Sequence, residues 1–374
     1  MPAALAGAGM SRTPPLAETH ERAGASFTDF GGWEMPVEFD SIRTEHHAVR
    51  ESAGVFDVSH MGQVAVTGPD AVELTDRLVT NDLVDREVGR AVYAAITDSE
   101  GVMLDDTVVY RRPSELLFVP NAGHDAETVE RWRAHRDEWG LDADVENRTA
   151  ETAMFALQGP EAVDVATDLG DSAIADLSRF EAAEFDVAGV DCWVARTGYT
   201  GEDGVEVILP ASEATTVWSA VREAGVQPCG LGARDTLRIE AGLLLSGQDF
   251  RPEENPRTPL EADIGFAVDL DGAGDFVGAD ALRAQHERGV DERIVGLRLL
   301  DRGVPREGYP IETADGERVG EVTSGTMSPT LGEPVGLGYV PVEHAAVGTE
   351  LRVVVRGDGK RARVVNKPFL EADE

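Results

Sequence analysis

The chain has 374 residues, 42% of them hydrophobic, and its 70 acidic and 33 basic side chains give a formal net charge of −37. This length suggests two or three domains of about 100–200 residues, and the apolar content suffices for packed cores. No apolar run approaches the ~18 residues of a membrane-spanning helix, and the first ten residues lack a signal-peptide pattern. We therefore expect a globular, cytoplasmic protein.

The acid excess is spread along the whole chain, and Lys360 and Lys367 are its only lysines. High salt screens the self-repulsion that such a charge creates, so we interpret the composition as adaptation to a salty, halophilic cytoplasm. The absence of a basic stripe disfavours a nucleic-acid partner.

The first pattern is a strand–helix–hairpin–helix unit. Residues 1–12 precede it without a pattern and are expected to form a disordered tail. A strand ends at Gly68, and Pro69 begins a helix at the position where a missing N–H has no cost. The remaining elements are two hairpin strands at 91–96 and 102–110 and a helix over 125–139.

A second copy of this unit begins with the strand 152–158, which ends at Gly159-Pro160. Its hairpin strands are predicted at 190–195 and 205–209, and its closing helix at 211–224. Two such copies indicate two related α+β units with antiparallel sheets. Aligning the two hairpins places Asp106 and Glu206 at corresponding positions, which predicts a ligand across the interface between the copies.

Glycines mark the stretch from Arg196 to Glu240. Residues 196–206 read as a tight hairpin whose three glycines supply positive φ angles. Residues 230–240 read as a glycine loop that leads into a helix. A polar planar ligand can lie between Glu206 and Arg234, because a carboxylate accepts two adjacent N–H donors and a guanidinium clamps a carboxylate.

After residue 256 short strands dominate and follow one helix at 279–286. The predicted strands are 294–299, 318–322, 335–340, 351–355 and 362–365. Glycine and proline separate them, which is typical of a small β-barrel or jelly-roll-like domain.

Several polar residues have two readings at this stage. Asp105 and Asp106 alternate on a predicted strand, so one can enter a site while the other turns away, or both can lie on a wet hairpin edge. Glu206 has the same two readings. His46 and His47 are adjacent on a helix and point apart, and the cysteines lack metal spacing, so we expect no metal site.

Several short motifs occur in colinear order from residue 13 to residue 370. They are Phe30-Gly31-Gly32-Trp33-Glu34-Met35-Pro36, Phe56-Asp57-Val58-Ser59-His60-Met61-Gly62, Leu104-Asp105-Asp106, Leu157-Gln158-Gly159-Pro160, Gly198-Tyr199-Thr200-Gly201-Glu202-Asp203-Gly204, Thr323-Ser324-Gly325, Ser328-Pro329-Thr330-Leu331-Gly332 and Lys367-Pro368-Phe369. In order and spacing this set resembles the aminomethyltransferase (T protein) family of the glycine cleavage system.

The resemblance implies a three-domain cloverleaf with folate in its central hole. The implied folate-binding domain is discontinuous and comprises residues 13–63 and 149–256. Residues 64–148 are expected to form the second α+β domain, also ferredoxin-like, and residues 257–374 the C-terminal β-barrel domain.

The resemblance also implies the site residues. Asp106 matches the family's catalytic aspartate, and Glu206 matches the acceptor for the pterin amino and ring N–H groups. The other implied contacts to tetrahydrofolate are Arg234, Tyr199, Tyr93, Met61 and Asn121. No metal is implied.

The implied reaction moves the aminomethyl carbon from the lipoyl group of H protein to tetrahydrofolate and gives 5,10-methylenetetrahydrofolate and ammonia. The implied partners are the lipoylated H protein, the glycine decarboxylase and the dihydrolipoyl dehydrogenase. Two alternatives share the fold: another folate-dependent transferase, such as a sulfonium-compound demethylase, and a non-catalytic folate-binding iron–sulfur assembly factor. The latter carries a cysteine in its glycine-glutamine signature, which residues 245–249 lack.

Overall fold

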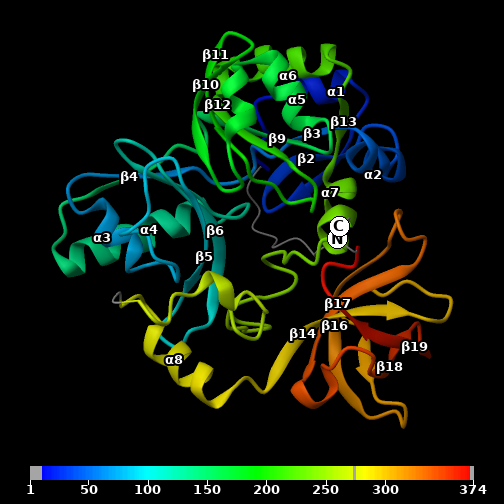
Figure 1. Ribbon diagram of the computed structural model, residues 1–374. Helices are drawn as coiled ribbons and strands as arrows, with labels where there is room; N and C mark the ends of the chain where they lie inside the picture. Colours follow the sequence, from blue (N-terminus) through cyan, green and yellow to red (C-terminus); the bar gives the residue numbers. More distant parts are fainter. Residues whose placement is uncertain (1–10, 273–274, 371–374) are drawn as a thin grey trace.

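The computed structural model describes residues 11–272 and 275–370. These residues form three lobes, each organised around its own sheet or barrel (Figure 1). Among them, no helix has the length and apolarity needed to cross a bilayer. The three-lobed α+β arrangement with a terminal barrel confirms the predicted fold class.

The first lobe contains a mixed six-stranded sheet of order β10-β11-β12-β9-β3-β13. Its N-terminal elements are α1 (Ala17–Arg22), β1 (Ser26–Phe30), β2 (Trp33–Glu38), α2 (Ile42–Glu51) and β3 (Gly54–Asp57). Its later elements are β9 (Thr152–Gln158), α5 (Ala162–Leu169), η1 (Ser172–Asp176), β10 (Ala182–Val187), β11 (Val190–Ala195), β12 (Gly204–Pro210), η2 (Ala211–Glu213), α6 (Ala214–Glu223), β13 (Gln227–Cys229) and α7 (Leu231–Glu240). Strands from two distant segments therefore share one sheet.

The second lobe is an antiparallel five-stranded sheet of order β5-β6-β7-β4-β8. Its elements are β4 (Val64–Thr67), α3 (Ala71–Asp76), β5 (Ala91–Thr97), β6 (Met103–Arg111), β7 (Leu116–Val119), α4 (Asp125–Trp139) and β8 (Asp144–Asn147). Buried and half-buried residues alternate along most of β6, as expected for a strand with one face in the core. We propose domain boundaries near residues 63 and 149, where the chain passes between the two sheets.

The two sheets repeat the same topology, with a different correspondence from the one predicted. Without β3, the larger sheet has the order β10-β11-β12-β9-β13, which matches the order β5-β6-β7-β4-β8 of the smaller sheet strand for strand. In this match β6 corresponds to β11, and β7 corresponds to β12. The prediction that Asp106 and Glu206 lie on corresponding hairpins is therefore wrong. The prediction did not include β10, because its acidic and aromatic side chains are half-buried or exposed and leave no apolar run. It also did not include the short strand β7.

The connection between β11 and β12 also differs from the prediction. Residues 196–203 form an extended loop between the two strands, and no tight two-residue turn joins them. Arg196 closes this loop by donating to both carboxylate oxygens of Asp203. Gly204 begins β12 at a φ of 158°, and a Cβ atom there would lie 2.3 Å from the carbonyl oxygen of Leu157. This position therefore requires glycine.

The third lobe is a closed six-stranded barrel. Its elements are β14 (Glu292–Leu299), β15 (Pro310–Glu312), β16 (Arg318–Met327), β17 (Pro334–Pro341), η4 (Val342–His344), β18 (Glu350–Val355) and β19 (Asp358–Val365). The five predicted strands are all present. The sixth, β15, is three residues long and begins with proline, so it lacks a detectable alternating pattern.

The chain packs against the second lobe before it enters the barrel (Figure 1). This segment contains η3 (Gly265–Ala267) and α8 (Ala279–Arg288). The N–H of Asp269 donates to the carbonyl oxygen of Thr80 at 2.8 Å, and the N–H of Val277 donates to that of Arg77 at 3.0 Å. The barrel strands thus begin at Glu292, whereas the prediction began the C-terminal domain at residue 257.

The sequence predicted a disordered tail over residues 1–12, of which residues 1–10 lie outside the described part of the chain. The last residue of this segment, Arg12, is held in place: it makes two hydrogen bonds to the buried carboxylate of Asp125, at 2.7 and 2.9 Å. The guanidinium of Arg12 also lies 4.3 Å from the ring centroid of Trp33. A pairing partner 113 residues away leaves no local signal in the sequence.

Candidate functional site

The first part of the candidate site surrounds Asp106 on β6. Tyr93 donates a hydrogen bond of 2.7 Å to one carboxylate oxygen of Asp106, and the side-chain amide of Asn121 donates one of 2.8 Å to the other. Tyr93 lies on β5, which pairs with β6, and Asn121 follows β7 on the other side of β6. The sheet therefore places three of the predicted residues in direct contact.

The environment of Asp106 favours its neutral form more than water does. Burial, together with the charge of Asp105, raises the pKa of Asp106 to about 6, although the hydrogen bonds from Tyr93 and Asn121 oppose the shift. Burial and the charge of Asp106 hold the pKa of Tyr93 well above its usual value, so the Tyr93 hydroxyl stays protonated and donates the hydrogen bond. Asp106 can thus both accept and release a proton near neutral pH.

The second part surrounds Glu206 on β12. The Glu206 side chain is buried, and one of its carboxylate oxygens accepts a hydrogen bond of 2.6 Å from the hydroxyl of Thr197. The hydroxyl of Tyr110 lies 3.5 Å from the same oxygen. The other oxygen of Glu206 has no hydrogen bond within the described residues, so it can accept one from a ligand.

Arg234 and Tyr199 form the third part. The guanidinium carbon of Arg234, at the start of α7, lies 4.4 Å from the ring centroid of Tyr199. Burial lowers the pKa of Arg234, and the charge of Glu206 offsets only part of this effect. Within the described residues, Nη1 of Arg234 is buried and has no hydrogen-bond partner. A buried guanidinium donor without a partner is costly, and an incoming acceptor relieves that cost.

Tyr110 connects these parts. It follows Asp106 by four residues on β6, so the two side chains share a face about 13 Å apart along the strand. The interaction of Tyr110 with Glu206 brings the second sheet against this face. The charges of Arg234 and Asp106 both act on Tyr199, whose pKa burial raises. Arg234 and Asp106 therefore each lie within electrostatic range of Tyr199.

Met61 completes the set of predicted residues. It follows β3 and packs against the hydrophobic cluster that contains Tyr110 and Ala195. Tyr199 is fixed by its hydroxyl, which donates to the carbonyl oxygen of Leu244. The structure thus joins Tyr93 and Asn121 to Asp106, and Tyr199 to Arg234. Tyr110 links the strand of Asp106 to Glu206, and the roles of all seven predicted residues stay predictions.

Sequence reasoning missed three residues at this place. Tyr110 and Thr197 hold Glu206, and Phe266 of η3 stacks on Tyr93 with the ring centroids 6.0 Å apart. Phe266 is 77% exposed, although it is a large apolar side chain. Tyr110 was detectable, because period-two alternation puts it on the face of Asp106. The position of Phe266 depends on the crossing of the chain from one lobe to another.

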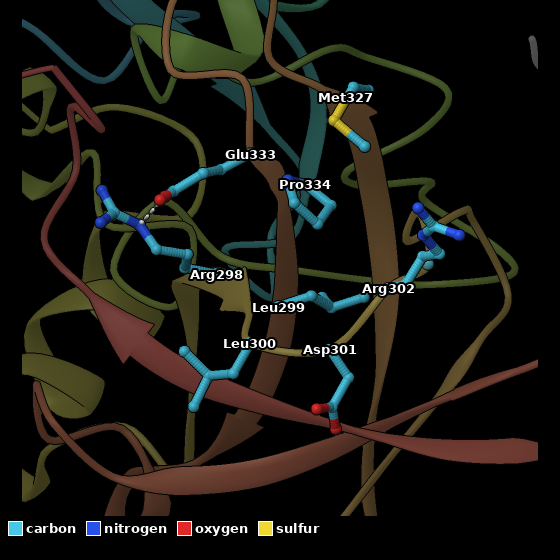
Figure 2. A pocket seen from close by; sticks show the side chains of 9 residues that line it. Arg298, Leu299, Leu300, Asp301, Arg302, Met327, Glu333 and Pro334 are labelled. Carbon is cyan, nitrogen blue, oxygen red and sulfur yellow. Dashed lines mark ion pairs between the residues drawn. The ribbon is translucent and has the colours of Figure 1, made fainter.

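Two surface hollows lie away from these residues. One, of about 360 Å³, is bordered by the barrel residues Arg298–Gly303 together with Met327, Glu333 and Pro334 (Figure 2). Figure 2 shows the ion pair between Arg298 and Glu333 at its edge, 3.1 Å long. The other hollow borders β1 and β2. Neither includes a predicted site residue.

The described residues contain no group of three or more histidine, cysteine, aspartate or glutamate side chains that could hold a metal ion. Both cysteines, Cys192 and Cys229, are buried and free. His46 is buried between the hydroxyls of Thr236 and Thr330, at 2.8 Å from each. The arrangement therefore offers carboxylates, tyrosines and one unsatisfied guanidinium to a polar aromatic ligand.

Two protein-family domains match successive parts of the chain and together cover almost all of it. The GCVT N-terminal domain matches residues 16–272, and the glycine cleavage T-protein C-terminal barrel domain matches residues 292–371. The gap between the matches contains α8, which agrees with a barrel that begins at Glu292.

Named relatives and a solved structure agree with these matches. A probable aminomethyltransferase of Natronomonas pharaonis is 64% identical over 362 residues, which are 96% of this chain and 99% of that protein. An aminomethyltransferase of Symbiobacterium thermophilum is 46% identical, over 97% and 98% of the two chains. Relatives in Haloarcula marismortui and Natronomonas pharaonis, both halophilic archaea, fit the interpretation of the acidic composition.

The crystal structure of the glycine cleavage system aminomethyltransferase T from Bartonella henselae superposes with a TM-score of 0.89. It is 34% identical to this chain, and the match covers 96% of this chain and 98% of that one. The chain therefore belongs to the GCVT family, the aminomethyltransferases of the glycine cleavage system.

Proposed function

We propose that the protein transfers the aminomethyl carbon from the lipoyl group of H protein to tetrahydrofolate, giving 5,10-methylenetetrahydrofolate and ammonia. The family membership supports the class of reaction. The observation that supports the proposal is that Tyr110, on the strand face of Asp106, reaches the buried Glu206, while Nη1 of Arg234 is buried without a partner among the described residues.

The residues present fit a reduced pterin. The open oxygen of Glu206 suits the amino and ring N–H donors at one edge of the pterin. The free Nη1 of Arg234 suits an acceptor on the same ligand. Tyr199 and Tyr93 offer aromatic groups to a flat ring. Met61 adds apolar surface beside them.

We assign the proton and charge handling to Asp106. Its carboxylate stabilises the positive charge that develops as ammonia leaves, and it can take a proton from the folate nitrogen. Tyr93 and Asn121 fix the orientation of both carboxylate oxygens, which removes a reorganisation cost at the moment of reaction. Each oxygen keeps a free lone pair for the substrate.

The proposed reaction requires the lipoylated H protein as donor, and it links the enzyme to the glycine decarboxylase and the dihydrolipoyl dehydrogenase in the cytoplasm. No metal is assigned a role. The aminomethyl carbon must reach Asp106, so the H protein is expected to deliver its lipoyl arm to the junction of the two sheets.

The test uses the purified protein in high salt with aminomethyl-loaded H protein and tetrahydrofolate, and it measures ammonia release. We expect activity in the wild type and a loss of ~100-fold or more in Asp106→Asn, because a proton-transfer and charge-stabilising group is removed. The melting temperature of the variant serves as the folding control. Near-normal rates would remove Asp106 from the mechanism, and turnover of a methylated sulfonium compound would favour the demethylase alternative.

A further inference from the structure

Asp105, the neighbour of Asp106, is a buried carboxylate with a complete set of partners. It is 3% exposed. Its oxygens accept hydrogen bonds from the backbone N–H of Asn121 at 3.0 Å and from the side-chain amide of Asn121 at 2.7 Å. The same amide also donates to Asp106 at 2.8 Å. One amide therefore joins two adjacent carboxylates, whose negative charges repel each other.

His124 supplies the positive charge that this arrangement needs. Its Nδ1 atom lies 3.1 Å from Oδ2 of Asp105. The backbone around it is fixed, since the N–H of His124 donates to the carbonyl oxygen of Asn121 and its own carbonyl oxygen accepts from Thr128. The imidazole is therefore directed at Asp105 from the turn that begins α4.

The charged groups that face His124 are Asp105, Glu127 and Asp106. Burial disfavours the imidazolium, but the hydrogen bond and the charge of Asp105 outweigh this and raise the pKa of His124 to about 9. Arg12 reaches the start of α4 from another segment, but its guanidinium pairs with Asp125 and lies over the ring of Trp33.

We propose that His124 is a positioning residue: its imidazolium neutralises Asp105, so that Asn121 can hold both carboxylates together and Asp106 alone faces the substrate. This proposal rests on the proposed function only for the role of Asp106. The contacts among His124, Asp105 and Asn121 are independent of it. Asp105 acts as the connection between the cation and the bridging amide.

Because His124 and Asp105 carry opposite charges, removing either one should shift the pH–rate profile in opposite directions. His124→Gln removes a positive charge near Asp106, so the acid limb of the pH–rate profile moves to higher pH. Asp105→Asn removes a negative charge, so the limb moves to lower pH. Each shift is expected to be roughly one pH unit, as for a nearby charge in a buried site. The double variant removes both charges, and its limb returns toward that of the wild type.

His124→Lys provides the matched control, because it keeps a cation at the same position and should leave the limb close to the wild-type position. A purely structural role would make His124→Gln and His124→Lys equally damaging. Melting temperatures of all variants, measured in the same high salt, show which of them are folded. Shifts of both single variants in the same direction would overturn the proposal.

A second measurement does not depend on activity. Proton–carbon NMR of the histidine rings follows each of the eight histidines with pH, and His124→Gln identifies the signal of His124. We expect this ring to stay protonated until about pH 9 in the wild type, and to titrate closer to ~6.5 in Asp105→Asn. Titration near 6.5 in the wild type would overturn the proposal. If aminomethyl transfer fails while the NMR result holds, the proposed function is at fault.

Discussion

Helix α7 carries two arginines one turn apart whose surroundings differ. Arg238 donates to Asp249 at 2.6 Å, to Asp235 at 2.9 Å and to the hydroxyl of Ser324 at 2.7 Å. The guanidinium of Arg234 lies over the ring of Tyr199, and its buried Nη1 has no hydrogen-bond partner among the described residues. The same helix therefore joins the barrel with one arginine and leaves the other ready for a ligand.

The C-terminal end of α7 repeats the satisfied pattern. The carboxylate of Glu240 accepts hydrogen bonds from Arg50 at 2.8 Å and from the hydroxyls of Ser328 and Thr330, at 2.5 and 2.9 Å. His46 lies 3.3 Å from it. At the junction with the barrel, every nitrogen of the Arg238 guanidinium and both oxygens of Glu240 have partners. At the candidate site, Nη1 of Arg234 and one oxygen of Glu206 have none among the described residues. Incomplete pairing in a buried position is the feature that distinguishes the site from the structural junction.

The largest expected effect on stability tests this contrast directly. Arg238→Met leaves the buried carboxylate of Asp249 without its cation and should lower the free energy of unfolding by about 3–5 kcal/mol. Arg234→Met removes a cation without a paired carboxylate and should change it much less. Denaturant unfolding at one fixed high salt concentration measures both. Equal losses in the two variants would abolish the distinction between the two ends of α7.

A pH series sharpens the contrast at Glu240. Burial alone would raise the pKa of Glu240, but the hydrogen bonds from His46, Ser328 and Arg50 lower it to about 2. A carboxylate with a depressed pKa stabilises the fold above its unfolded value of about 4.3, and this contribution is lost as pH falls toward 2.

Glu240→Gln should therefore be less stable than the wild type at neutral pH, and the difference should shrink between about pH 4.3 and 2. Unfolding midpoints in a constant salt concentration measure it. Ser41→Ala, at the exposed N-cap of α2, serves as a control, because its cost should not depend on pH in this range. A difference that stays constant with pH would contradict the assignment.

The sequence predicted those elements whose pattern is local. The helix at 125–139 and the five longer barrel strands appear where periodicity and glycine placed them. The alignment of the two repeats failed because β10 contains no apolar run and β7 is only four residues long. Strand order depends on pairing between distant segments, which a local pattern does not contain.

Family resemblance supplied the candidate residues as a set, but the sequence did not indicate the contacts among them. Nothing local indicates that Tyr110 contacts Glu206 across 96 residues. The same holds for the histidine that pairs with Asp105, since a lone histidine before a helix is most often structural. The bridging role of Asn121 depends on β7 lying beside β6. These contacts follow from the sheet order that the sequence did not provide.

The central claim is that a reduced pterin binds where the two sheets meet, between Asp106 and the pair Glu206 and Arg234. Calorimetric titration with tetrahydrofolate under anaerobic, high-salt conditions tests it most directly. The account predicts saturable binding to the wild type and to Asp106→Asn. It predicts affinities lower by roughly 10–100-fold in Glu206→Gln and Arg234→Met, as for lost charged hydrogen bonds. No saturable uptake by the wild type, or equal affinity in all four proteins, would contradict it.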